Sequence, residues 1–174
     1  MWPWVQSLSV VLVTFILQAA VAPHMAIMGA EPDIILIVTA LYGFTFGPTI
    51  GALVGFSGGL LGDLLAGPHV GLGLISKSIV GFFAGMVQKT IFVENILLPM
   101  LAIFVATWLN EFVYVGFLFL FGDVFPIKQV VLQVVLPSAI YNAVLTPFVY
   151  VATRRLMQFK QQETPMVNIT KKYE

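Results

Sequence analysis

Apolar residues fill most of the chain, and short polar or proline-containing segments interrupt them. Each apolar stretch is about as long as a helix that crosses a bilayer, which needs roughly 20 residues. The pattern predicts six membrane-spanning helices, in residues 4–22, 32–46, 48–66, 70–88, 95–121 and 127–153. The connections leave no room for a separate soluble domain. We therefore expect an all-α, polytopic membrane protein folded as a compact bundle of about six transmembrane helices.

Prolines mark where these helices should begin, end or bend. Gly47-Pro48 separates the second and third spans, and a second Gly-Pro step at residues 67–68 follows the third, so both steps predict tight turns. Pro137 and Pro147 fall inside the last span. A proline removes a backbone hydrogen bond, so we expect a kink or local break there unless neighbouring groups satisfy the freed carbonyls.

Glycine recurs every fourth residue from Gly43 to Gly59, and the run stops just short of Asp63. In a helix, each glycine costs roughly 1 kcal/mol relative to alanine. In lipid, small residues at this spacing let two helix backbones approach closely, and close packing stabilises the pair. Pro48 breaks the run, which therefore serves at least two helices. We expect helix packing at seven glycines: Gly47, Gly51, Gly55, Gly59, Gly62, Gly81 and Gly85.

The first apolar segment also has a feature of secretory signal peptides, because Ala-Val-Ala at residues 20–22 resembles a cleavage site. However, no Lys or Arg precedes the segment, and Pro23 would directly follow the cleaved bond. We therefore interpret the segment as a retained first helix, with Trp2 and Trp4 at the membrane interface.

The composition supports a membrane protein and excludes several classes of function. The 174 residues are 59% hydrophobic and 9% charged, whereas soluble domains have about 25% charged residues. The formal net charge is zero, so no basic surface indicates nucleic-acid binding, and the lack of cysteine excludes disulfides and thiolate sites. No P-loop, HExxH or GxSxG motif occurs. We expect neither an enzyme nor a bound metal or other cofactor.

Basic residues predict the orientation of the six spans. With the N-terminus inside, the outer loops hold one basic residue, Lys128, and the inner side holds six, as the positive-inside rule requires. The six are Lys89, Arg154, Arg155, Lys160, Lys171 and Lys172. We predict a transmembrane domain of residues 1–157 with both termini in the cytoplasm, followed by a short, polar, disordered tail of residues 158–174.

Ionisable side chains inside an apolar bundle are costly unless they are paired, so each is a candidate for a structural or partner-binding role. Asp33 follows Pro32 and should begin a helix at the outer surface; contact with a partner is the alternative. Asp63 and Lys77 flank the turn at residues 67–68. We favour an ion pair between them over a polar site for a substrate or partner, and over two side chains that reach the interface independently.

Three further polar side chains lie in the fifth and sixth spans. Glu111 should face the bundle interior, with Lys77 as its expected cationic neighbour. We favour a structural or docking role for it, since a proton relay would need more ionisable residues than the chain has. Ser138 and Asn142 lie on one helix face just after Pro137. We expect them to satisfy carbonyls freed by that proline, with hydrogen bonds across helices as the alternative.

The order of these features resembles the MreD family of bacterial rod-shape-determining proteins. The resemblance covers most of residues 1–160, and its most specific element is the glycine-rich segment that ends in Leu61-Gly62-Asp63. The other shared features are Pro32-Asp33, Gly71-Leu72 with Ser76, the helix around Gly81 and Gly85, and Pro137-Ser138 with Asn142 ahead of a basic end.

The resemblance implies a non-catalytic scaffold in the cell-elongation machinery of the bacterial inner membrane, which helps to regulate peptidoglycan synthesis and rod shape. Members of the family work with the bitopic protein MreC, and through it with the actin-like MreB and the enzymes that polymerise and cross-link peptidoglycan. We expect the transmembrane helix of MreC to dock on a glycine-lined face and the remaining outer surface to contact lipid. Self-association stays open.

The family is also similar in fold to the substrate-capture subunits of energy-coupling-factor transporters, which are six-helix bundles. This similarity supplies an alternative function, the capture of a vitamin or other small molecule in an outward-facing pocket lined by Asp63, Lys77 and Glu111. The predicted outer loops are short, whereas a capture subunit should have long loops to cover its ligand. We therefore favour the scaffold.

Overall fold

The computed structural model describes residues 3–26, 30–66, 70–87, 97–123 and 126–161, and every regular element in them is helical. The elements are α1 (Pro3–Val21), η1 (Ala22–Met25), α2 (Ile34–Phe46), α3 (Pro48–Ala66), α4 (Leu72–Met86), α6 (Leu97–Leu120), α7 (Ile127–Val130), η2 (Val131–Val135) and α8 (Leu136–Gln161). Each predicted span coincides with one helix or with the α7–η2–α8 run, which confirms the all-α class. Helix α8 continues into the expected tail as far as Gln161, and the rest of that tail lies outside the described residues.

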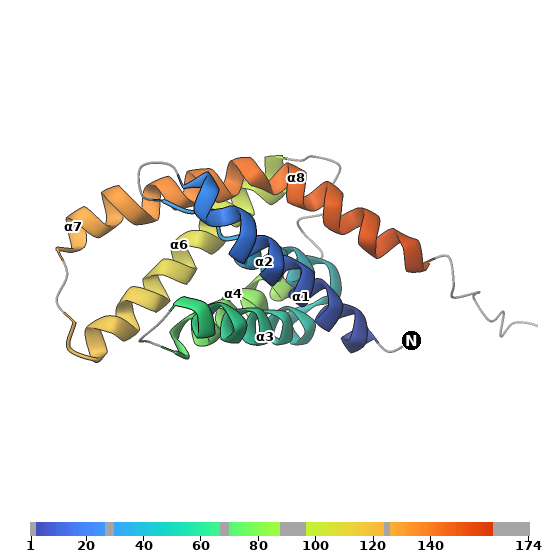
Figure 1. Ribbon diagram of the computed structural model, residues 1–174, viewed down its shortest axis with the longest axis horizontal. Helices are drawn as coiled ribbons and strands as arrows, with labels where there is room; N and C mark the ends of the chain where they lie inside the picture. The colour runs from blue at the N-terminus through green and yellow to red at the C-terminus, as the bar shows by residue number, and fades with distance from the viewer. Residues whose placement is uncertain (1–2, 27–29, 67–69, 88–96, 124–125, 162–174) are drawn as a thin grey trace, which may run out of the picture.

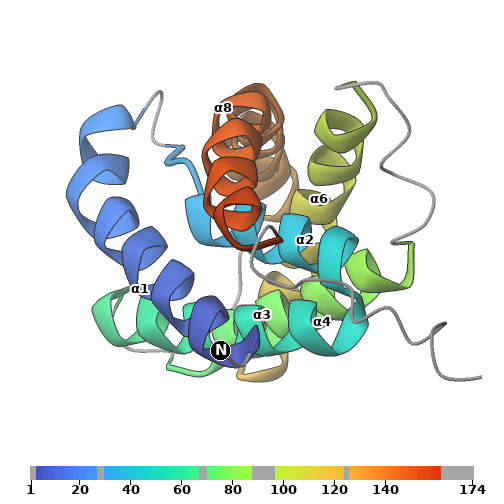
Figure 2. The same cartoon turned by 90° about the vertical axis from the view of Figure 1, so that its right-hand side faces the viewer.

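Helix α2 forms the centre of the bundle (Figure 1). Figure 2 shows α1, α3, α4, α6 and α8 arranged around it. Residues 35–44 are all buried, because neighbouring helices cover every side. The 13 residues of α2 make a helix about 20 Å long, which is shorter than the roughly 30 Å hydrocarbon core of a bilayer. Protein surrounds this short helix, and that explains why it is apolar on all faces.

Two apolar clusters hold α2 in place. The first joins it to α4 and α6 through Leu36, Ile37, Ala40, Leu41, Phe44, Val80, Ala84, Ile103 and Ala106. The second joins it to α1 and α3 through Val11, Val38, Tyr42 and Val54. Lipid is as apolar as these side chains, so a bundle in a bilayer gains its stability from close packing rather than from transfer out of water.

The turn between α2 and α3 is a single residue, Gly47. Its φ of 90° lies in the left-handed region, which glycine adopts without strain. The Gly47 N–H donates to the Gly43 carbonyl over 2.9 Å. Pro48 is the first residue of α3. The N–H of a first helical residue has no acceptor within the helix, so proline removes no helical hydrogen bond at this position. The tight hairpin predicted at Gly47-Pro48 is therefore confirmed.

Helices α3 and α4 pack backbone against backbone. Gly51 and Gly81 face each other so closely that a Cβ on either would collide with the carbonyl oxygen of the other. Gly55 lies in the same way against the backbone carbonyl of Lys77. The expectation that these glycine faces are free to receive a partner helix is therefore wrong, because α4 already occupies them.

The remaining glycines of the predicted packing set differ from one another. Gly59 lies against the carbonyl of Gly73, and Gly85 lies against Pro48 at the start of α3. In both places a Cβ would meet backbone atoms that cannot move aside. Gly62 is less restricted, since a Cβ there would make an ordinary contact of 3.7 Å with a side chain of α2. Close approach therefore explains Gly59 and Gly85 but not Gly62.

The last helical run contains an irregularity just before Pro137, as predicted. Element η2 is a π-helical turn, after which the Leu136 N–H donates to the carbonyl of Val131, five residues earlier. Pro147 lies inside α8, which continues through it. The irregularity is thus one wide turn within a continuous helical run rather than a gap between two helices.

Three helical segments of the described residues are long and apolar enough to cross a membrane: Pro48–Leu65, Leu97–Leu120 and Ile127–Thr153. The apolar helices Ser9–Met25, Ile34–Phe46 and Leu72–Met86 are shorter. Length and composition therefore support a membrane protein, and the count of six crossings stays a prediction.

Candidate functional site

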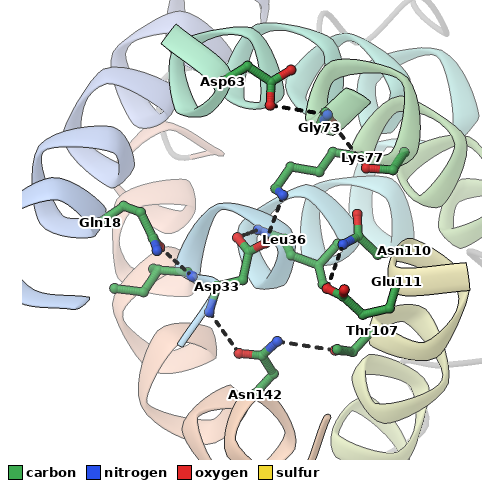
Figure 3. Close-up of polar contacts among 12 residues, drawn as sticks. Gln18, Asp33, Leu36, Asp63, Gly73, Lys77, Thr107, Asn110, Glu111 and Asn142 are labelled. Atoms are coloured by element: carbon green, nitrogen blue, oxygen red, sulfur yellow. Dashed lines mark hydrogen bonds and ion pairs between the residues drawn. The ribbon is translucent and has the colours of Figure 1, made fainter. Parts of the chain in front are cut away.

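Polar side chains from four helices and from the residue before α2 gather around the start of α2 (Figure 3). They come from α1, from the residue that precedes α2, and from α4, α6 and α8. We call this group the polar network; its members are Gln18, Asp33, Lys77, Thr107, Asn110, Glu111 and Asn142.

Asp33 is the centre of the polar network. Its Oδ1 accepts a hydrogen bond of 2.9 Å from the Leu36 N–H, and its Oδ2 lies 2.7 Å from the Lys77 Nζ. The helix start expected after Pro32-Asp33 is confirmed, since α2 begins at Ile34. The carboxylate therefore caps the positive end of α2 and binds the ammonium group of α4 at the same time.

Lys77 pairs with Asp33, so the expected ion pair with Asp63 is wrong. The side chains of Lys77 and Asp33 are 14% and 25% exposed, and most of the pair is thus inside the protein. Helix α4 begins at Leu72, which places Lys77 more than one turn along it. From there the long side chain extends toward the start of α2 (Figure 3) rather than toward the α3–α4 turn.

Asp63 instead caps α4. Its Oδ2 accepts hydrogen bonds from the Gly71 N–H at 2.8 Å and the Leu74 N–H at 3.0 Å, and its Oδ1 accepts one from the Gly73 N–H at 3.1 Å. These N–H groups stand at the positive end of α4 and have no intrahelical acceptor. Asp63 is buried, and three N–H donors stabilise its charge without a cation. It therefore closes the α3–α4 hairpin.

We expect Asp63→Asn to lower the free energy of unfolding by about 1–3 kcal/mol, because the substitution removes the charge and replaces one acceptor oxygen by an amide that faces N–H donors. Thermal unfolding of the purified protein in detergent measures the change. Glu31→Gln is the control, since Glu31 is exposed, and it should change the free energy by less than about 0.5 kcal/mol. Equal stability of the two variants would contradict the role of Asp63 as a cap.

Asn142 joins α2, α6 and α8. Its Oδ1 accepts a hydrogen bond of 2.9 Å from the Asp33 N–H, and its Nδ2 donates to the Thr107 Oγ1 over 3.2 Å. Repair of the Pro137 irregularity, the role that the sequence favoured for this side chain, is therefore wrong, and the bond across helices is found instead. Ser138, one turn earlier on the same face, is buried as well.

Two members of the network, Gln18 and Thr107, were not expected from the sequence. Gln18 accepts a hydrogen bond from the Ile34 N–H and donates one to the Pro32 carbonyl, each 2.8 Å long, and so fixes the chain that enters α2 against α1. Both residues are polar side chains on mainly apolar helices, as Asn142 is, so the same sequence signal marks all three.

Glu111 and Asn110 are, with Thr107, the members of the network on α6. The Asn110 Nδ2 donates to the Glu111 Oε1 over 3.1 Å. Asn110 is 3% exposed, and its Oδ1 has no hydrogen-bond partner among the described residues. Lys77 acts electrostatically on Glu111, as expected, but its ammonium group is bound to Asp33. The neutral amide of Asn110 thus binds Glu111, while the nearby Lys77 ammonium group pairs with Asp33.

The arrangement suits the attachment of helices to one another. The bonds of the polar network and of Asp63 run from side chains to the backbone at the starts of α2 and α4, and to side chains of neighbouring helices. In lipid each of these groups would be costly if it were alone. In the described part of the chain, His, Asp and Glu side chains form no group of three that would hold a metal ion. The network therefore fixes the relative positions of five helices.

A model of the family described as rod shape-determining protein MreD matches residues 1–160. The chain belongs to the MreD family. The resemblance seen in the sequence is thus confirmed, and the protein is a membrane protein related to cell shape. No curated protein and no solved structure matches the chain.

The segments that carry the MreD resemblance meet one another in the fold. Asp33, from the first of them, donates its N–H to Asn142, from the last. Asp63, at the end of the glycine-rich segment, binds the N–H of Gly71 in the next one. Two pairs of the segments that carry the resemblance are therefore joined by hydrogen bonds in the fold.

Proposed function

We propose that this MreD protein is a non-catalytic integral membrane scaffold of the bacterial cell-elongation machinery. It binds MreC and, through MreC, acts with MreB and the peptidoglycan synthases to regulate wall synthesis and rod shape. The match to the MreD family over residues 1–160 carries the proposal. The geometry supports it, because the buried polar groups bond helix to helix and make a rigid bundle suited to holding a partner.

We place six membrane crossings with both termini in the cytoplasm, on the basis of the asymmetry of basic residues. In this topology α2 and α4 begin at the outer side, and α6 ends there. The polar network then lies in the outer half of the membrane, where α2 starts and where α6 carries Glu111.

Co-purification tests the proposal. When the protein is produced together with MreC, we expect the two to elute from a size-exclusion column in detergent as one complex. We also expect cells that lack the protein to lose their rod shape and to regain it when the protein is supplied. An unrelated multi-spanning membrane protein is the control. Recovery of no more MreC than with the control, from protein that is folded, would contradict the proposal.

One observation favours the alternative, a capture subunit for a vitamin or other small molecule: polar side chains from four helices and from the residue before α2 converge at one place. However, two of the three residues expected to line such a pocket are already engaged, Asp63 by backbone N–H groups and Lys77 by Asp33. A thermal-shift screen of the purified protein against vitamins separates the two functions. Tight, saturable binding would favour capture, and the scaffold predicts none.

A further inference from the structure

The carboxylates near the polar network are not equally neutralised. Asp63 accepts three backbone N–H groups, and Asp33 binds Lys77 and a backbone N–H. Glu111 accepts one hydrogen bond, from the neutral amide of Asn110. Among the side chains that the structure describes, Lys77 is the cation of the polar network and pairs with Asp33, so Glu111 leaves the network with one excess negative charge. An unpaired charge is costly in lipid, and this imbalance suits one further cation.

Asn110, on the same turn of α6, gives Glu111 one N–H group and no positive charge. The buried Oδ1 of Asn110 has no hydrogen-bond partner in the described part of the chain, and the amide nitrogen of this residue is already used by Glu111. Figure 3 shows the two side chains next to each other on α6. A buried carboxylate that receives one neutral N–H group matches a partner with several N–H donors, such as an ammonium or a guanidinium.

Glu111 borders an uncovered apolar face of α6. Phe112, the next residue, is 79% exposed, and no described part of the chain packs over it. Leu101, Val105 and Phe119 are also exposed, and their spacing places them on the same side of the helix. A helix that lies along this face would contact Phe112 and Phe119 and would reach Glu111 at its edge.

The depth of Glu111 limits where a cation can come from. The residue lies about 14 Å along the axis from the end of α6 at Leu120. The 24 residues of α6 extend about 36 Å, only about 3 Å beyond a hydrocarbon core of roughly 30 Å at each end, so Glu111 lies well below the lipid headgroups. The described helices of a second copy offer no free cation at this depth, since Lys77 is bound to Asp33, Lys128 lies in the first turn of α7, and the basic residues of α8 follow the apolar segment that ends at Thr153.

We infer that the apolar face of α6 bordered by Glu111 docks a partner transmembrane helix that carries a basic side chain, and that this side chain pairs with Glu111. The inference rests on the proposed function, because it names the surface and the chemistry by which the scaffold holds its single-spanning partner. The sequence had suggested a glycine-lined face as the docking site, but α4 covers the glycines of α3, so we assign docking to this surface of α6 instead.

The first test uses the full-length protein and full-length MreC. Glu111→Gln keeps the size of the side chain and removes its charge. We expect it to weaken the complex at least about tenfold, because a buried charge on the partner loses its counterion. Glu31→Gln, at an exposed position, should leave the affinity unchanged. If a Lys or Arg of the MreC helix is the partner, changing it to Glu should restore binding to the Glu111→Lys protein.

The second test locates the partner while Glu111 stays intact. The chain has no cysteine, so single cysteines can be introduced without a background. We expect Phe112→Cys and Phe119→Cys to form disulfide cross-links with cysteines placed along the MreC helix in membranes. The controls are Leu64→Cys on α3 and Phe148→Cys on α8, whose native side chains are 63% and 72% exposed, and these should not cross-link.

Unchanged affinity of a folded Glu111→Gln protein would overturn the inference, and so would cross-links at Leu64 or Phe148 in place of Phe112. If Glu111→Gln does not fold, the cross-links decide. A wild-type complex with cross-links elsewhere refutes this inference and leaves the proposed function standing. Failure of the wild-type protein to bind MreC refutes both.

Discussion

The Gly81→Leu protein should fail to form the native bundle, whereas Gly116→Leu should fold like the wild type. At Gly81 even a Cβ would collide with the backbone of Gly51, and a backbone held in a helix cannot move aside. Adding a single methylene to a packed core costs about 1–3 kcal/mol, and leucine adds four carbons, so we expect a loss of more than about 3 kcal/mol. Around Gly116 the structure has no atom within 4 Å of an added Cβ.

Both variants put the same side chain in place of a helical glycine, so the comparison separates packing from helix propensity, which favours leucine at both positions. The yield of monodisperse protein from detergent extracts and its thermal midpoint measure the outcome. The reciprocal Gly51→Leu should behave like Gly81→Leu, because the two glycines face each other. A Gly81→Leu protein with the wild-type midpoint would show that α3 and α4 are not in backbone contact.

The positions of the helices could be predicted from the sequence because the bilayer restricts length and composition so strongly. A stretch of about 20 apolar residues has few options in lipid other than a helix. Proline and glycine then mark the ends, as Gly47-Pro48 does between α2 and α3. The spacing of glycines also indicated close packing of backbones. It did not show which helix approaches, and the structure assigns that place to α4 rather than to a partner.

The hydrogen-bond and ion-pair partners of the polar side chains could not be predicted from the sequence in the same way. Asp63 and Lys77 are close in sequence, and a hairpin between them made an ion pair reasonable. Which carboxylate a lysine reaches depends on how α4 is rotated against α2, and that rotation is set by contacts such as Gly43 with Gly81. The N–H groups at the start of α4 also compete for Asp63, and they occupy both of its carboxylate oxygens. Asn142 differs from the prediction for the same reason, since tertiary packing brings Asp33 within its reach.

The Lys77→Met protein should be the least stable of three variants that test the ion pair at the centre of the network. Removing one partner of a buried pair costs about 3–5 kcal/mol, because the other charge stays buried alone. Lys77→Met leaves two acids without their cation, Asp33 by direct contact and Glu111 through space. Asp33→Asn should cost less, since Lys77 keeps Glu111 as a neighbour, and asparagine still accepts the hydrogen bond of the Leu36 N–H as an N-cap.

The double variant Lys77→Met with Asp33→Asn should recover much of the stability that Lys77→Met loses, because replacing a buried pair by neutral groups of similar size is often close to neutral. Thermal or denaturant unfolding of all four proteins in one detergent gives the coupling energy of the double-mutant cycle. Additive effects would show that the two side chains act independently and would contradict the contact. A double variant as unstable as Lys77→Met would instead mean that Glu111, rather than Asp33, is the acid that depends on this lysine.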